Sequence, residues 1–124
     1  MRRWQALAAI LLTVAVAVAA CSEEKTPRIT AAGNPELGQR AIRRYGCGSC
    51  HTIPGVKGAT ALAAPPLIHF SKRQFIAGRL PNNEENLIRW VMNPQDVEPG
   101  TAMPTLGVSD QDARNIAAYL LSIK

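Results

Sequence analysis

Residues 47–51 read Cys47-Gly48-Ser49-Cys50-His51, and the rest of the chain is organised around this stretch. Two cysteines three positions apart lie on one side of a helical turn, where each thiol can add to one vinyl group of a haem. The histidine that follows can then serve as an axial iron ligand. The spacing therefore predicts one covalent haem c, bound by Cys47 and Cys50 and ligated by His51.

Two other uses of a C-x-x-C motif fit the chain less well. A structural zinc site needs four ligands, and outside the motif only Cys21 and His69 remain. A disulfide redox pair is typical of a βαβ context, and no strand pattern flanks this motif. The redox pair is kept as the next alternative, and His69 is interpreted as a surface or structural histidine.

The length and composition indicate a small domain whose own side chains form only a thin hydrophobic core. The chain has 124 residues, which indicates one domain, and only 5% of them are aromatic. So few large side chains make a thin core, and a buried haem would supply the missing apolar bulk. The formal charge is +5, and the basic residues are scattered, which indicates docking to an acidic protein or membrane surface and argues against nucleic acid.

The N-terminus is predicted to be an export signal. Residues 1–3 are basic, and residues 6–20 form an apolar run that is short for a spanning helix, which needs about 20 residues. Small residues before Cys21 resemble the bacterial lipobox, which predicts a signal peptide over residues 1–20, cleavage before Cys21 and lipidation of its thiol. Residues 21–33 are polar and are interpreted as a flexible tether.

Two alternatives for the N-terminus stay open: an ordinary signal peptide with an incidental cysteine, and an uncleaved anchor. All three readings place the domain outside the cytoplasm, and the predicted location is the cell envelope, anchored at a membrane and facing the periplasm or the exterior. In the lipidated form the lipid on Cys21 would hold the chain at the membrane. Lipidation would also explain why the chain has a third cysteine besides the two of the motif.

Residues 34–124 are predicted to form one all-α domain with three main helices and one or two short ones. The expected starts of the main helices are Asn34, Asn82 or Asn83, and Ser109. Gly46 is expected to end the first helix and Pro94 the second. A short helix is expected over residues 71–77, ended by Gly78.

Gly38 lies inside the first predicted helix, where it costs up to about 1 kcal/mol relative to alanine. A close approach of another helix would explain it. Tyr119, in the last predicted helix, is the candidate to lie over Gly38, and that contact would lock the two helices together.

Two proline-rich loops are expected to form the walls of the haem pocket. Residues 52–66 hold three prolines, and the Pro65 carbonyl could accept a hydrogen bond from Nδ1–H of His51. Residues 93–104 are interpreted as a rigid loop that presents Met103, whose thioether is a soft iron ligand. Trp90 is expected either to line the pocket or to be an ordinary core residue.

The order of these features resembles a class I, or mitochondrial-type, monohaem cytochrome c over about residues 34–124. Asn93-Pro94 and Pro99-Gly100-Thr101-x-Met103 resemble the family in spacing as well as residue type. The resemblance implies axial ligation by His51 and Met103, the Pro65 carbonyl on His51, and Thr101 near a propionate. The chain is similar to bacterial cytochromes c and to cytochrome c domains fused to terminal-oxidase subunit II.

Three details depart from that family pattern. Gly38 is nine residues before Cys47, one more than in the mitochondrial form. Ile42 stands where the family has an aromatic residue, and Ala64 stands where glycine usually precedes the proline. These changes affect expected packing more than expected ligation.

The predicted function is one-electron transport in a bacterial respiratory chain, with a terminal oxidase or a dehydrogenase complex as redox partner. No nucleophile–base pair and no acid–base carboxylate pair is evident, so no turnover of its own is predicted. The chain would act as a monomer or as a subunit of a respiratory complex. The alternatives are a haem subunit of a larger periplasmic redox enzyme and a gas- or peroxide-reactive sensor with a labile Met103.

Overall fold

The computed structural model describes residues 33–124, and the predictions for residues 1–20, Cys21 and most of the tether lie outside these residues. The helices are α2 (Pro35–Arg44), α3 (Glu84–Met92), α4 (Pro94–Val97) and α5 (Asp110–Ser122), with 3-10 turns at Cys47–Ser49 and Phe70–Lys72. Strands β1 (Phe75–Ile76) and β2 (Leu80–Pro81) form one antiparallel pair. The mostly helical architecture was expected, and the β pair was not.

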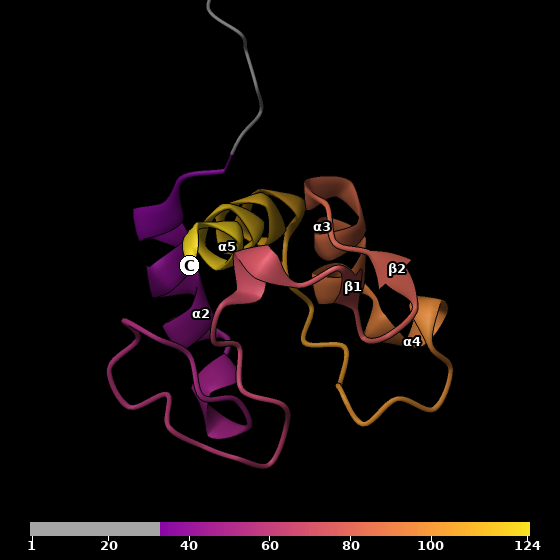
Figure 1. Cartoon of the computed structure of the whole chain (residues 1–124), viewed down its shortest axis with the longest axis horizontal. Coiled ribbons are helices and arrows are strands. Elements are labelled where there is room, and N and C mark those ends of the chain that lie inside the picture. Colours follow the sequence, from indigo (N-terminus) through magenta and orange to yellow (C-terminus); the bar gives the residue numbers. More distant parts are fainter. Residues whose placement is uncertain (1–32) are drawn as a thin grey trace, which may run out of the picture.

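α5 is the central element of the fold, with α2 on one side and α3 on the other (Figure 1). It begins as predicted at Ser109, whose hydroxyl accepts from the Asp112 N–H at 3.2 Å. One face of the helix is buried in the core and includes Ala113, Ile116 and Leu120. None of the helices in residues 33–124 is long and apolar enough to cross a membrane.

The start of α5 is reinforced by a polar cluster around the Asp112 carboxylate. Hydrogen bonds from Ser109 and Tyr45, and the charge of Arg44, lower the pKa of Asp112 below its usual 3.8. Arg44 lies at the end of α2 and pairs with Asp112 at 2.6 Å. The cluster therefore ties the end of α2, next to the C-x-x-C-H motif, to the first turn of α5.

α2 begins at its predicted cap and crosses α5 at its predicted glycine. The Asn34 side chain accepts from two N–H groups of the first turn, as an N-cap does. A Cβ placed on Gly38 would lie 2.0 Å from the Asn115 carbonyl oxygen and 3.0 Å from Cβ of Tyr119. The Gly38–Tyr119 crossing is confirmed, and the backbone of Asn115 lies closer still.

The helix predicted over residues 71–77 is wrong. Only residues 70–72 are helical, Arg73 is already extended, and residues 75–81 form the β hairpin. Ala77 and Gly78 have φ of 51° and 70°, and a tight turn with two left-handed residues suits the twist of a hairpin. The Ala-Gly pair is therefore a hairpin turn and not the end of a helix.

The expected rigid loop over residues 93–104 begins with a helix instead. Pro94 ends α3 as predicted, but it also occupies the first position of α4. A proline fits there because its missing N–H would have no partner in the first turn. The loop that carries Met103 is therefore shorter than expected and starts from a helix packed next to α3.

Candidate functional site

A cavity of about 790 Å³ lies between the loop after α2 and the loop after α4. This volume is within the roughly 300–1,000 Å³ of small-molecule and cofactor sites. Most of its lining is apolar, with contributions from Ile42, Leu87, Ile116 and Leu120. All seven residues predicted for the site line this cavity: Cys47, Cys50, His51, Pro65, Trp90, Thr101 and Met103.

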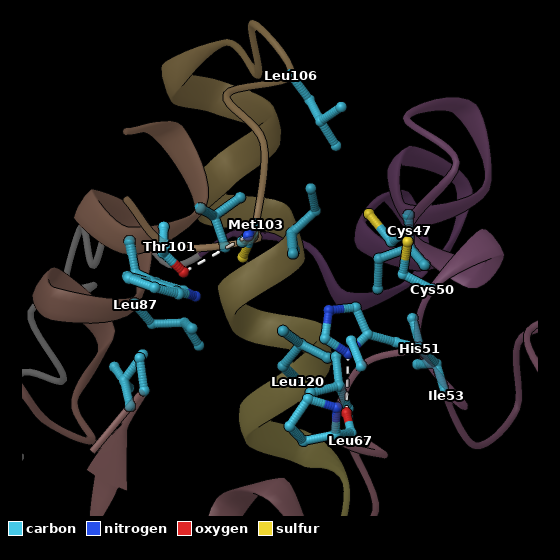
Figure 2. Close-up of a pocket in the computed structure, with 18 of the residues that line it drawn as sticks. Cys47, Cys50, His51, Ile53, Leu67, Leu87, Thr101, Met103, Leu106 and Leu120 are labelled. Atoms are coloured by element: carbon cyan, nitrogen blue, oxygen red, sulfur yellow. Dashed lines mark hydrogen bonds between the residues drawn. The ribbon is translucent and has the colours of Figure 1, made fainter. Parts of the chain in front are cut away.

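The local backbone turns the motif side chains toward the cavity. Gly46, with φ of 71°, ends α2 and reverses the chain, and a 3-10 turn follows at Cys47–Ser49. The Cys47 carbonyl accepts from the N–H of Cys50 at 3.3 Å and of His51 at 3.0 Å. The two thiols and the imidazole consequently lie together on one side of the cavity (Figure 2).

The environment of Cys47 argues against this thiol as the nucleophile of a disulfide redox pair. Cys47 and Cys50 are both free, and burial raises the pKa of the Cys47 thiol above its usual 9.0. Reactive redox cysteines need a lowered pKa, because the thiolate is the nucleophile. The direction of this shift is the opposite of what that alternative requires.

His51 is oriented by the Pro65 carbonyl, as predicted from the sequence. Its Nδ1 lies 2.8 Å from the Pro65 oxygen, so Nδ1 carries the proton and donates (Figure 2). Nε2 then keeps its lone pair for a metal. The loop that supplies Pro65 is tied to the motif by hydrogen bonds from Ala64 N to Cys50 O, at 2.9 Å, and from Leu67 N to Thr52 O, at 2.8 Å.

Arg73 supports the same turn and was missed from the sequence. Its guanidinium donates to the Pro66 carbonyl and lies over the Phe70 ring, 5.3 Å from the centroid. The Asn82 side chain donates in turn to the carbonyls of Phe70, at 2.9 Å, and Arg73, at 3.0 Å. Arginine-to-carbonyl bonds across seven residues of loop leave no sequence pattern, so no motif could have found them.

Met103 and Thr101 lie on the opposite side of the cavity from His51 (Figure 2). Thr101 Oγ1 is 3.5 Å from the Met103 N–H, and both side chains are half-buried. Trp90 lines the cavity and also packs against the hydrophobic core, so both interpretations of this residue hold at once. Met92, the last residue of α3, packs against the core too.

The remaining polar groups near the cavity have partners or lie elsewhere. Arg79 and Glu98 both line it and form an ion pair with each other. His69 is exposed and is not part of the lining, in agreement with a surface histidine. Within residues 33–124, His, Cys, Asp and Glu side chains form no group of three or more that could hold a metal ion.

The arrangement fits an apolar group with a metal ion at its centre. Two thiols and an imidazole nitrogen stand on one wall, a thioether stands on the other, and apolar side chains fill the space around them. Imidazole and thioether are together the axial ligands of low-spin haem iron in electron carriers. The cavity therefore agrees with the haem that the motif predicts.

Known proteins agree with this fit. The family model described as Cytochrome c matches residues 35–124. Cytochrome c oxidase subunit 2 of Alkalihalophilus pseudofirmus is 36% identical over 88 residues, covering 70% of this chain and 25% of that protein. The protein of the same name from Bacillus subtilis is 33% identical over 93 residues, covering 70% and 26%.

The chain spans about a quarter of the length of these curated relatives. No solved structure gives a significant match. The family match covers the motif, both loops and every described helix. The chain belongs to the cytochrome c family, as a class I cytochrome c that resembles cytochrome c oxidase subunit 2.

Proposed function

We propose that this chain is a one-electron carrier of a bacterial respiratory chain. Cys47 and Cys50 would hold one covalent haem c, with His51 and Met103 as its axial ligands. The observation that carries the proposal is the placement of an imidazole and a thioether on opposite walls of one apolar cavity, with two free thiols beside the imidazole. The bound haem would supply reversible one-electron transfer between ferrous and ferric iron.

The residues around the ligands would keep the site the same in both oxidation states. The Pro65 carbonyl fixes the tautomer and plane of His51 and makes its Nε2 a stronger donor. Trp90 and the aliphatic lining would exclude water from the ligands. Thr101 would donate to a haem propionate. The sequence shows no nucleophile–base pair and no acid–base carboxylate pair, and we propose electron transfer without substrate turnover.

The proposed partner is a terminal oxidase, and the similarity to cytochrome c oxidase subunit 2 supports it. The same similarity favours a second candidate, in which the chain is a haem-carrying subunit that relays electrons within a larger redox enzyme. Co-purification after mild detergent extraction separates the two. A stoichiometric oxidase or dehydrogenase partner indicates the subunit, and a chain that elutes alone indicates the free carrier.

The proposed location is the cell envelope, with the domain held at a membrane by a lipid on Cys21. The support comes from the sequence, since Cys21 lies outside the described residues. Cys21→Ala should move the chain from the membrane fraction to the soluble fraction. If the variant stays with the membrane, the signal segment or a partner is the anchor instead.

The haem itself is tested by a haem stain on a denaturing gel and a reduced-minus-oxidised spectrum. The wild type should stain, and the double variant Cys47→Ser with Cys50→Ser should neither stain nor accumulate. Cys21→Ser is the matched control, because it removes a cysteine outside the motif and should keep the stain. A folded, soluble double variant would count against a haem-built core.

The sensor alternative is tested by ligation at Met103. Met–iron ligation gives the ferric protein a weak far-red absorption band, and a closed site prevents CO from binding the reduced protein. The carrier should show the band and bind no CO. A protein without the band that binds CO rapidly would instead be a gas-reactive haem protein.

A further inference from the structure

The segment that carries Met103 has little backbone structure of its own. Pro99 and Pro104 have no N–H to donate, and Gly100 is left-handed, with φ of 83°. Among residues 99–107, the one backbone–backbone hydrogen bond runs from Thr101 N to the carbonyl before Pro99, at 3.0 Å. A fixed position for Met103 therefore requires bonds from side chains elsewhere.

Gln95 supplies those bonds from the first turn of α4. Its Nε2 donates to the carbonyls of Thr101, at 2.8 Å, and Met103, at 3.0 Å. Its Oε1 accepts from the N–H of Gly100 at 3.1 Å. One side chain thus bonds three of the four backbone units between Gly100 and Met103.

The amide is itself anchored to the core of the protein. Pro94, directly before Gln95, is one of the largest fully buried side chains of the described residues. It is the first residue of α4, and Asn93 alone separates it from the end of α3 at Met92. Gln95 is half-buried and does not line the cavity, so its influence on the site passes through the loop.

The amide of glutamine suits this position, and the side chain most similar to it in shape, that of glutamate, does not. A primary amide offers two N–H donors and an acceptor, and here all three functions are used. Glutamate has nearly the same shape but no N–H, so its carboxylate would face two carbonyl oxygens. Gln95→Glu therefore removes the two bonds to the carbonyls of Thr101 and Met103, with almost no change in volume, and keeps an acceptor for the N–H of Gly100.

We propose that Gln95 is a positioning residue that holds the Met103 loop against the cavity and so sets the strength of Met103 ligation. The inference rests on the proposed function, because it takes Met103 as the distal ligand. Each lost bond of this kind shifts an equilibrium by about fivefold. Loss of two such bonds in Gln95→Glu, or three in Gln95→Ala, partly replaced by water, should favour displacement of the thioether by about tenfold.

The test compares purified wild-type holoprotein with Gln95→Ala, Gln95→Glu and Asp96→Asn. Asp96 is the next residue of α4 and is exposed, so Asp96→Asn controls for disturbance of the helix. Two readouts report on ligation. The first is the pH at which the ferric protein loses its far-red band as the pH is raised, and the second is the rate at which the reduced protein binds CO. Thermal unfolding by circular dichroism is recorded alongside.

Both Gln95 variants should lose the band at a pH about one unit lower than wild type, which corresponds to tenfold, and should bind CO faster. Asp96→Asn should match wild type in both. If the Gln95 variants unfold earlier but keep the wild-type band midpoint and exclude CO, Gln95 is only structural and the inference is wrong. A wild type that lacks the band overturns Met103 ligation itself, which is the failure of the proposed function. Gln95→Glu keeps the volume of the side chain, so it carries the test if Gln95→Ala does not fold.

Discussion

The crossing of α2 and α5 offers a substitution for which two opposing effects can be weighed. Gly38 is buried inside α2, and alanine there would be the better helix former. The added Cβ, however, would lie 2.0 Å from the carbonyl oxygen and 2.6 Å from the carbonyl carbon of Asn115. Both are backbone atoms of α5, so no side-chain rotation relieves the contact, and the helices must move apart.

The size of the effect follows from these two terms. Replacing glycine by alanine inside a helix stabilises the helix by about 1 kcal/mol. Overpacking a tight core contact costs up to about 3 kcal/mol, and a backbone clash belongs at that end of the range. Gly38→Ala should therefore destabilise the protein by about 2 kcal/mol, which lowers the melting temperature of a domain of this size by roughly 10 °C.

The assay is thermal unfolding of the holoprotein, followed by far-UV circular dichroism and by haem absorbance. Arg40→Ala is the matched control, because Arg40 is an exposed residue of the same helix, and its effect should stay within about 0.5 kcal/mol. A Gly38→Ala protein as stable as wild type, or more stable, would refute the reasoning. Helix propensity would then dominate, and the two backbones could not be in close contact.

Three further substitutions test other parts of the fold. Asp112 has a folded pKa below its unfolded value, so it adds stability above about pH 4 that is lost as the pH falls further. Asp112→Asn should therefore cost about 1 kcal/mol at neutral pH in urea unfolding, and the difference should shrink below pH 4. Ala77→Gly should stabilise the hairpin turn by about 1 kcal/mol, because φ of 51° is strained for alanine, and urea unfolding checks it. Tyr119→Phe removes the 2.7 Å bond to the Pro54 carbonyl and should cost about 1 kcal/mol by the same measurement.

The features that could be predicted from the sequence are those with a local cause. The start of α2 depends on the Asn34 cap and Pro35, which are adjacent in the chain, and the structure confirms it. The Gly38–Tyr119 contact was predictable because a glycine inside a helix needs a reason. The convergence of the two proline-rich loops on one cavity followed from the chemistry expected of the C-x-x-C-H motif.

The features that were missed have causes distributed over the chain. The segment 71–77 was too short for helical periodicity to be decisive, and the left-handed turn at Ala77 and Gly78 decided its structure. Arg73 and Gln95 bond to backbone carbonyls, and a carbonyl is present at every position of the sequence. A side chain that recognises backbone therefore leaves no residue pair to search for.

The two walls of the cavity are held in place by different means. His51 lies two residues beyond a 3-10 turn. Its backbone bonds to Cys47, and its imidazole bonds to a loop that is itself hydrogen-bonded to the motif. Met103 lies in a segment with one backbone hydrogen bond and depends on the Gln95 amide. Regions with few internal bonds open at a lower free energy than the rest of a domain. With the proposed ligands, the Met103 side is consequently where ligation would be lost first. The Gln95 hydrogen bonds would then decide whether the haem stays closed or becomes accessible to small molecules.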